Sequence, residues 1–276
     1  MTTVSEDVED VVEIDRLLEA IFRRYHYDFR GYARTHVRRR VERARAALGS
    51  PSVARLRDRV LSEPTMFDAL LGHLTIQVSD LFRDPGYYEV LRREVVPHLA
   101  TYPCPRIWVA GCGMGEEAYS MAILLHEEGL LERSLVYATD IDESSLRSGE
   151  SATYDLDRLR GFSENYFLAG GRTSLSDYYT TACSRAAFRP FLRRRILFSD
   201  HCLATDAAFA EVQFVSCRNV LIYFDRPLQD RAIGLFRDSL CPRGFLGLGS
   251  KEALAWSRHA GAFEAFAAAE RIYRRS

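Results

Sequence analysis

The most informative stretch of the sequence is Arg106-Ile-Trp-Val-Ala110-Gly-Cys-Gly-Met-Gly-Glu-Glu-Ala-Tyr-Ser120. A short apolar run predicts a β-strand, three glycines follow at alternate positions (Gly111, Gly113 and Gly115), and two acids open an amphipathic helix. Glycine has no Cβ and tolerates positive φ, so such a turn lets backbone approach a bound small molecule. A tight structural turn would use the same glycines, and the motif alone leaves both interpretations open.

The two acids, Glu116 and Glu117, restrict the kind of ligand. A dinucleotide site spaces its glycines as G-x-G-x-x-G and keeps the helix N-terminus free for a pyrophosphate. Two carboxylates at that position would repel a phosphate. A cationic ligand with hydroxyl groups fits better, and S-adenosylmethionine has a sulfonium charge, a ribose and no phosphate.

Composition indicates an ordinary water-soluble protein. The 276 residues are enough for two modest domains, and a net charge of −1 favours neither nucleic acid nor membrane. The six cysteines form no C-x-x-C pair, and no His or Cys lies at metal-ligand spacing, so we expect free thiols in a reducing compartment and no metal. No stretch approaches the roughly 20 apolar residues of a membrane span. We therefore expect a cytoplasmic protein without membrane insertion.

Hydrophobic periodicity divides the chain in two. Apolar residues at helical spacing predict four helices before residue 75, with Ser50 and Pro51 as the N-cap and first residue of the third. From Ile107 onward, short apolar runs alternate with helical stretches, which predicts an α/β fold with a parallel sheet. The rhythm breaks near 161–193, where we expect a small antiparallel β insertion. The expected domains are residues 1–85, helical with a linker, and 86–276, Rossmann-like.

An acid ends the second predicted strand, Leu135–Thr139. Asp140 lies where doubly wound folds place a carboxylate on ribose hydroxyls. It could instead cap the next helix, but Asp142 fits that role better because Glu143 begins the helix. We therefore assign Asp140 to the ribose.

Two further segments have polar residues at positions where a ligand could bind. Ser79 and Arg83 lie between the helical part and the glycine-rich strand, and either line a cleft or belong to a surface helix capped by Ser79. Arg218 and Asn219 follow the run Val212–Ser216, at the strand end where open α/β sheets bind ligands. Together with Tyr223 they could orient a carboxylate.

These blocks resemble the CheR-type chemotaxis receptor methyltransferases, which methylate receptor glutamates with S-adenosylmethionine. The resemblance covers almost the whole chain, and its most specific part is the octapeptide Cys217-Arg-Asn-Val-Leu-Ile-Tyr-Phe224. It implies a Rossmann-like S-adenosylmethionine-dependent methyltransferase domain with a small β-subdomain insertion, preceded by a small all-α domain. The product of the cofactor would be S-adenosylhomocysteine.

The resemblance also implies residue roles. The cofactor contacts would be Gln77, Ser79, Arg83, Gly111, Gly113, Glu117, Asp140, Cys202, Leu203, Arg218 and Asn219. Arg83 and Tyr223 would orient the acceptor carboxylate or line the methyl-transfer centre. Three positions depart from the common pattern: Gln77-Val-Ser79 replaces Asn-x-Thr, Cys202-Leu203 replaces Asn-Leu, and Gly113 replaces Ser. We expect these departures to weaken or shift cofactor affinity without abolishing it.

The implied partner is the cytoplasmic domain of a methyl-accepting chemoreceptor. The helix 34–45 has six arginines opposed only by Glu42, and these form either a solvated face or a docking face for acidic receptor helices. The β-subdomain is a second candidate contact. We expect a monomer that binds no nucleic acid. The alternatives are a non-catalytic S-adenosylmethionine-binding adaptor and an RNA methyltransferase, although no Asn/Asp-Pro-Pro-Tyr/Phe loop is present.

Overall fold

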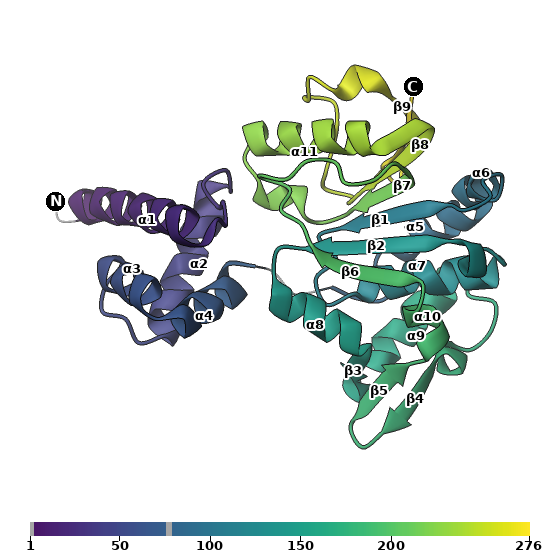
Figure 1. Cartoon of the computed structure of the whole chain (residues 1–276), viewed down its shortest axis with the longest axis horizontal. Coiled ribbons are helices and arrows are strands. Elements are labelled where there is room, and N and C mark those ends of the chain that lie inside the picture. The colour runs from purple at the N-terminus through teal and green to yellow at the C-terminus, as the bar shows by residue number, and fades with distance from the viewer. Residues whose placement is uncertain (1–2, 76–78) are drawn as a thin grey trace. The chain divides into compact units, whose positions relative to one another are not determined.

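The computed structural model describes residues 3–75 and 79–276, with side chains from residue 11 onward in the first of these segments. Two compact units make up the chain (Figure 1). The helical unit consists of Met1–Ile76, Cys202–Asp206 and Ile222–Ala232. The sheet unit consists of Gln77–His201, Ala207–Leu221 and Ile233–Ser276.

The helical unit is built on the four helices that the periodicity predicts. They are α1 (Thr3–Tyr25), α2 (Arg34–Ala47), α3 (Val53–Ser62) and α4 (Pro64–Leu74). The apolar stripe of α1, from Ile14 to Ile21, is buried as expected for an amphipathic helix. The rings of Tyr25 and Phe67 stack with centroids 3.9 Å apart, which joins α1 to α4.

The start of α3 corrects one prediction. The N-cap is Ser52, whose hydroxyl accepts the Arg55 backbone N–H, and the helix begins at Val53. Ser50 and Pro51 therefore lie in the preceding loop, and Ser50 Oγ accepts a hydrogen bond from Arg59 instead. Two serines flank the proline, and only the contact with Arg59, nine residues away, decides which of them caps the helix.

The sheet unit contains a seven-stranded sheet in the order β6-β2-β1-β7-β8-β10-β9 (Figure 1). The first five of these strands run parallel, and β10 is antiparallel to both β8 and β9. The strands are β1 (Arg106–Ala110), β2 (Leu135–Asp140), β6 (Ile196–Asp200), β7 (Val212–Cys217), β8 (Leu240–Leu248), β9 (Phe263–Ala267) and β10 (Ile272–Arg275). This confirms the predicted α/β fold with its parallel sheet. The two last strands, β9 and β10, were not predicted, because both are short and mostly half-exposed.

Helices pack on both faces of this sheet, so its central strands are buried on both sides. Along β1, Ile107 and Val109 belong to the core cluster that includes the apolar face of α7, whereas Trp108 lies edge-on to Phe236 of α11. The helices of the Rossmann-like part are α5 (Pro85–Val90), α6 (Val96–Leu99), α7 (Glu116–Glu127), α8 (Glu143–Ser151), α10 (Pro190–Arg193) and α11 (Arg226–Ser239), whose residues up to Ala232 belong to the helical unit. A π-helical turn, Leu91–Val95, joins α5 to α6.

The β-subdomain is a separate antiparallel sheet in the order β3-β5-β4. Its elements are β3 (Thr153–Asp155), α9 (Leu159–Leu168), β4 (Tyr179–Ala182) and β5 (Arg185–Phe188). Its first strand lies before residue 161, where the break in the sequence pattern begins. The Glu127 carboxylate, at the end of α7, accepts hydrogen bonds from the hydroxyls of Tyr166 and Tyr178 and so attaches the subdomain to the main sheet.

Two expectations about chemistry can be compared with the structure. All six cysteines are free thiols, and Cys112 and Cys217, next to the predicted site, are buried. Within residues 3–75 and 79–276, no helix is long and apolar enough to cross a membrane.

Candidate functional site

The glycine-rich turn leaves β1 at Ala110 and enters α7 at Glu116, and its three glycines have different functions. All three have positive φ: +73° at Gly111, +53° at Gly113 and +91° at Gly115. A Cβ at Gly111 would lie 2.4 Å from Val220 Cγ2, and one at Gly115 would lie 3.1 Å from Phe198 Cζ. A Cβ at Gly113 would meet nothing within 4 Å. Gly111 and Gly115 are thus required by protein packing, whereas Gly113 exposes its backbone to open space where a ligand can approach.

Asp140 holds this turn against the second strand. It is the last residue of β2, and its Oδ2 accepts the Gly113 backbone N–H at 2.8 Å while Oδ1 accepts that of Asp142 at 3.1 Å. Burial raises the pKa of the Asp140 carboxyl, and the two backbone hydrogen bonds oppose that shift. Asp142 is the N-cap of α8, accepting from the N–H groups of Ser144 and Ser145. The capping role is therefore filled by Asp142, and Asp140 lies beside Gly113.

Glu116 points away from the open side of the turn. Its side chain is fully buried and forms an ion pair with Arg158 at 2.7 Å. Burial raises the pKa of Glu116, and the hydrogen bond from Arg158 opposes the shift. Arg158 also donates to the Ser79 carbonyl oxygen, so one guanidinium connects the β-subdomain, α7 and the segment before α5. Glu116 is therefore enclosed by the protein, and of the two acids only Glu117 keeps some exposure.

Glu117 lies in a network that fixes its carboxylate. Ser216 Oγ donates to Oε1 at 2.6 Å, and Arg218 Nη1 lies 3.4 Å from Oε2. The Tyr87 hydroxyl is 2.9 Å from Ser216 Oγ, and its ring lies 4.0 Å from the Arg218 guanidinium. Because β7 lies beside β1 in the sheet, Ser216 and Arg218 arrive at Glu117 although about 100 residues separate them in sequence.

Arg218 is almost completely enclosed, with 1% of its side chain exposed. Besides Glu117, it donates to Asp84 Oδ2 at 2.8 Å and to the Arg83 carbonyl oxygen at 2.9 Å. The acids around Arg218 raise its pKa, while burial lowers it. Arg218 therefore stays charged and holds Glu117 and the segment before α5 in place.

The segment before α5 is irregular. Phe82 and Asp84 have φ of +50° and +56°, and α5 begins at Pro85 with Asp84 before it. The alternative of a surface helix capped by Ser79 is therefore wrong. Arg83 is half-buried, and within the described residues its guanidinium has no hydrogen bond or ion pair. Gln77, the remaining predicted residue of this segment, lies outside the described residues.

The loop after β7 places Asn219 at the carboxyl edge of the sheet, with a left-handed φ of +61°. Its backbone N–H donates to Glu252, a residue that sequence reasoning missed. No motif surrounds Glu252 in the sequence, and only its 4% exposure in the fold marks it as unusual for a charged residue.

Three predicted residues belong to the helical unit. Cys202 begins a turn closed by Asp206, whose Oδ2 accepts the Cys202 backbone N–H at 2.9 Å. Leu203 is buried, and its carbonyl oxygen accepts from Arg231. The Tyr223 ring lies edge-on to His36, with centroids 5.4 Å apart, and 5.7 Å from the Arg40 guanidinium.

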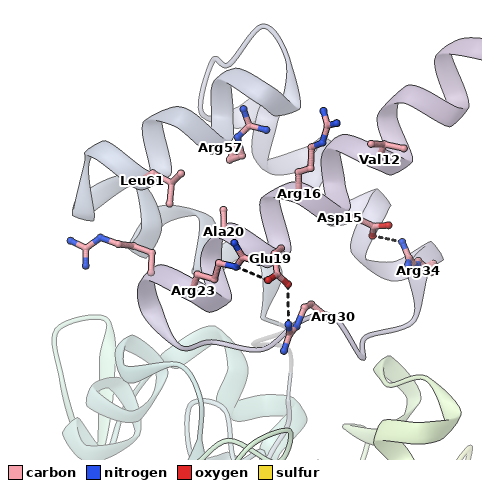
Figure 2. A pocket seen from close by; sticks show the side chains of 11 residues that line it. Val12, Asp15, Arg16, Glu19, Ala20, Arg23, Arg30, Arg34, Arg57 and Leu61 are labelled. Atoms are coloured by element: carbon pink, nitrogen blue, oxygen red, sulfur yellow. Dashed lines mark hydrogen bonds and ion pairs between the residues drawn. The ribbon is translucent and has the colours of Figure 1, made fainter.

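The helical unit also has an open hollow of about 800 Å³ along α1 and α3 (Figure 2). Figure 2 shows Arg16 and Arg57 beside the apolar side chains of Val12 and Leu61. The lining residues that carry a charge are Asp15, Arg16, Glu19, Arg23, Arg24, Arg30, Arg34 and Arg57, six arginines against two acids. The lining is therefore basic, and it also contains the apolar residues Val12, Ala20 and Leu61.

Two family models match the chain. The model described as "CheR methyltransferase, SAM binding domain" matches residues 77–271, and "CheR methyltransferase, all-alpha domain" matches residues 12–75. This chain belongs to the CheR methyltransferase family. Its cofactor is S-adenosylmethionine, and Gly113, Asp140 and Glu117 form an arrangement that fits it: an open backbone cradle, a carboxylate next to that cradle and an anchored anion, with no phosphate group to accommodate.

Curated relatives agree with the family. The "Putative methyltransferase Cher3" of Pseudomonas putida is 51% identical over 265 residues, which cover 96% of this chain and 97% of that protein. The "Chemotaxis protein methyltransferase 1" of Pseudomonas aeruginosa is 33% identical over 63% of this chain and 65% of its own length. The "Chemotaxis protein methyltransferase" of Listeria innocua is 29% identical over 68% of this chain and 70% of its own.

Proposed function

We propose that this protein transfers the methyl group of S-adenosylmethionine to glutamate side chains on the cytoplasmic helices of chemoreceptors. The observation that carries the proposal is the geometry at the carboxyl edge of the sheet, where Asp140 holds Gly113 and the carboxylate of Glu117 is fixed at the start of α7. The family includes proteins named chemotaxis protein methyltransferase.

The proposed site divides the work among three parts. Glu117, held by Ser216 and Arg218, faces the ammonium of the cofactor's amino-acid end. Asp140 accepts hydrogen bonds from the ribose hydroxyls, and the Gly113 backbone lies along the ligand. Arg218 then acts through Glu117, because its own guanidinium is already used by protein groups.

The chemistry requires no general base, because a glutamate is already ionised at neutral pH. When bound, S-adenosylmethionine supplies a methyl group on a positively charged sulfur. A bond forms between this carbon and a carboxylate oxygen while the carbon–sulfur bond breaks, which leaves a neutral ester and S-adenosylhomocysteine. Orientation of the two reactants supplies most of the acceleration, about 7–11 kcal/mol in well-oriented systems.

We assign Arg83 to the acceptor carboxylate, since its guanidinium has no partner within the described residues and its backbone carbonyl is held by Arg218. Tyr223 is assigned the same role from its place in the octapeptide motif. Cys202 and Leu203 are proposed to contact the cofactor on the same basis, as are Ser79 and Asn219.

Incubation with labelled S-adenosylmethionine and the cytoplasmic fragment of a chemoreceptor from the same organism tests the activity. We expect a base-labile methyl ester on the receptor. Cofactor binding without ester would instead support the adaptor, and label in RNA would support the RNA methyltransferase. Arg83→Ala should abolish turnover with the fold intact, whereas Arg160→Ala, which removes an exposed ion pair, should not. Near-normal methylation by Arg83→Ala would refute the assignment.

The receptor surface is proposed to lie on the helical unit. Arg40 of α2 donates to the carbonyl oxygens of His73, Leu74 and Thr75, and therefore stabilises the end of α4 rather than facing a partner. Arg34, the first residue of α2, lines the basic hollow of Figure 2. The positive charge of this hollow suits an acidic amphipathic helix as its partner.

Charge reversal tests that surface. Arg38→Glu with Arg39→Glu should raise the KM for receptor and leave cofactor affinity unchanged. The matched control is Arg147→Glu, on an exposed face of α8. An equal rise in KM with the control would show a general charge effect and count against the docking face.

A further inference from the structure

The loop that follows β7 contains a residue with a left-handed backbone. Asn219 has φ of +61°, a region that non-glycine residues adopt rarely and that Asn tolerates better than most. Such a conformation persists only where the surrounding structure imposes it. The contacts of this loop therefore indicate what keeps Asn219 in place.

Glu252 supplies two of those contacts, and a third to the turn after β8. Its Oε2 accepts the backbone N–H groups of Gly249 at 2.6 Å and Asn219 at 3.1 Å, and its Oε1 accepts that of Val220 at 3.0 Å. The residue is 4% exposed, so these hydrogen bonds form away from water. A buried carboxylate is costly unless hydrogen bonds compensate it, and hydrogen bonds to a charged acceptor are stronger than neutral ones.

The space around the Glu252 carboxylate is too tightly packed for a side chain at position 249. A Cβ at Gly249 would lie 2.8 Å from both the Asn219 nitrogen and Glu252 Oε2, and 3.0 Å from Asn219 Nδ2. Position 249 therefore has to be glycine for the carboxylate to reach both strand ends. The loop after β7 and the turn after β8 are joined through one carboxylate.

Arg218, the neighbour of Asn219 in this loop, does not hold the Asn219 backbone. Arg218 points to Glu117 and Asp84, so it fixes the segment before α5. Asn219 is half-buried at the carboxyl edge of the sheet. Of the contacts described above, the hydrogen bond to Glu252 is the one that orients its main chain.

We infer that Glu252 is a positioning residue for cofactor binding, which acts by holding the backbone of Asn219 in its left-handed conformation. This inference rests on the proposed cofactor contact of Asn219. Glu252 itself touches no reacting atom; its effect passes through the loop, so it should appear in S-adenosylmethionine affinity rather than in the chemical step.

The substitution Glu252→Gln keeps the shape of the side chain. One carboxylate oxygen becomes an NH₂ group, so at least one of the three backbone donors would face another donor. We expect the dissociation constant for S-adenosylmethionine, measured by calorimetry, to rise at least tenfold. Glu252→Asp keeps the carboxylate but shortens the side chain by one methylene. It should give a smaller rise in the dissociation constant.

The matched control is Glu127→Gln. Glu127 is also a buried carboxylate with several hydrogen bonds, but these attach the β-subdomain. We expect it to lower the melting temperature without changing the dissociation constant. If both variants weaken binding in proportion to their loss of stability, Glu252 has a general structural role and the inference is overturned.

A double-mutant cycle separates this inference from the proposed site. Asn219→Ala alone should weaken binding, and adding Glu252→Gln should then have little further effect. If Asn219→Ala leaves affinity unchanged, the proposed cofactor contact fails and the inference fails with it. If Asn219→Ala weakens binding but Glu252→Gln does not, only the positioning role is refuted. Should Glu252→Gln not fold, Glu252→Asp takes its place in the same cycle.

Discussion

Two glycines of the turn after β1 should differ in their response to the same substitution. Replacement of Gly111 should mainly lower stability, and replacement of Gly113 should mainly lower cofactor affinity. Gly111→Ala and Gly113→Ala each place a methyl group on a backbone with positive φ, which costs about 1–2 kcal/mol in either case. The surroundings then separate them, because the new Cβ meets Val220 Cγ2 at 2.4 Å in one variant and open space in the other.

The difference in stability follows from that contact. Overpacking a buried site typically costs about 1–3 kcal/mol, which adds to the backbone cost only in Gly111→Ala. The free energy of unfolding should therefore fall by about 2–5 kcal/mol in Gly111→Ala and by about 1–2 kcal/mol in Gly113→Ala. For a domain of this size, each kcal/mol shifts the melting temperature by about 2–4 °C.

Affinity for S-adenosylmethionine should show the reverse order. In Gly113→Ala the methyl group occupies the open space that we propose for the ligand. A tenfold loss of affinity corresponds to about 1.4 kcal/mol. Denaturation in urea would measure stability, and calorimetry at a temperature where both variants are folded would measure binding. If Gly113→Ala binds the cofactor like the unmodified protein, or is the less stable of the two, the separation of packing and ligand glycines is incorrect.

Two other predictions concern the buried acids. Because burial raises the pKa of Asp140, cofactor affinity should decline on acidification at a higher pH than for an ordinary aspartate, and Asp140→Asn should remove that part of the pH dependence in a binding titration. The sign follows from ionisation, since only the carboxylate can accept hydrogen bonds from both the turn and the ribose. Arg158→Leu should destabilise the fold by about 3–5 kcal/mol by leaving Glu116 buried and unpaired, and adding Glu116→Gln should recover part of that loss in urea denaturation; a double variant no more stable than Arg158→Leu would contradict this.

The strand–turn–helix unit and the acid at the end of β2 could be predicted because their signals are local. Short apolar runs mark the strands, and Asp142 is identified as the N-cap by the helix that follows it. The cap of α3 was misplaced by two residues because Ser50 and Ser52 are equivalent locally.

The different roles of Glu116 and Glu117 could not be predicted. Both lie in the first turn of α7, and no local feature of the sequence distinguishes them. Arg158 lies 42 residues away, and Ser216 and Arg218 lie 99 and 101 residues away, so only the fold brings each partner to its acid.

The sequence by itself determined the family, the parallel sheet and the edge of that sheet where the predicted site residues lie, because these depend on periodicity and on residues adjacent in the chain. The tertiary structure decided which glycine faces open space, which of the two acids is fully buried and which carboxylate holds the loop after β7. These depend on where side chains from distant strands end up, and parallel strands bring their carboxyl ends together regardless of their separation in the chain.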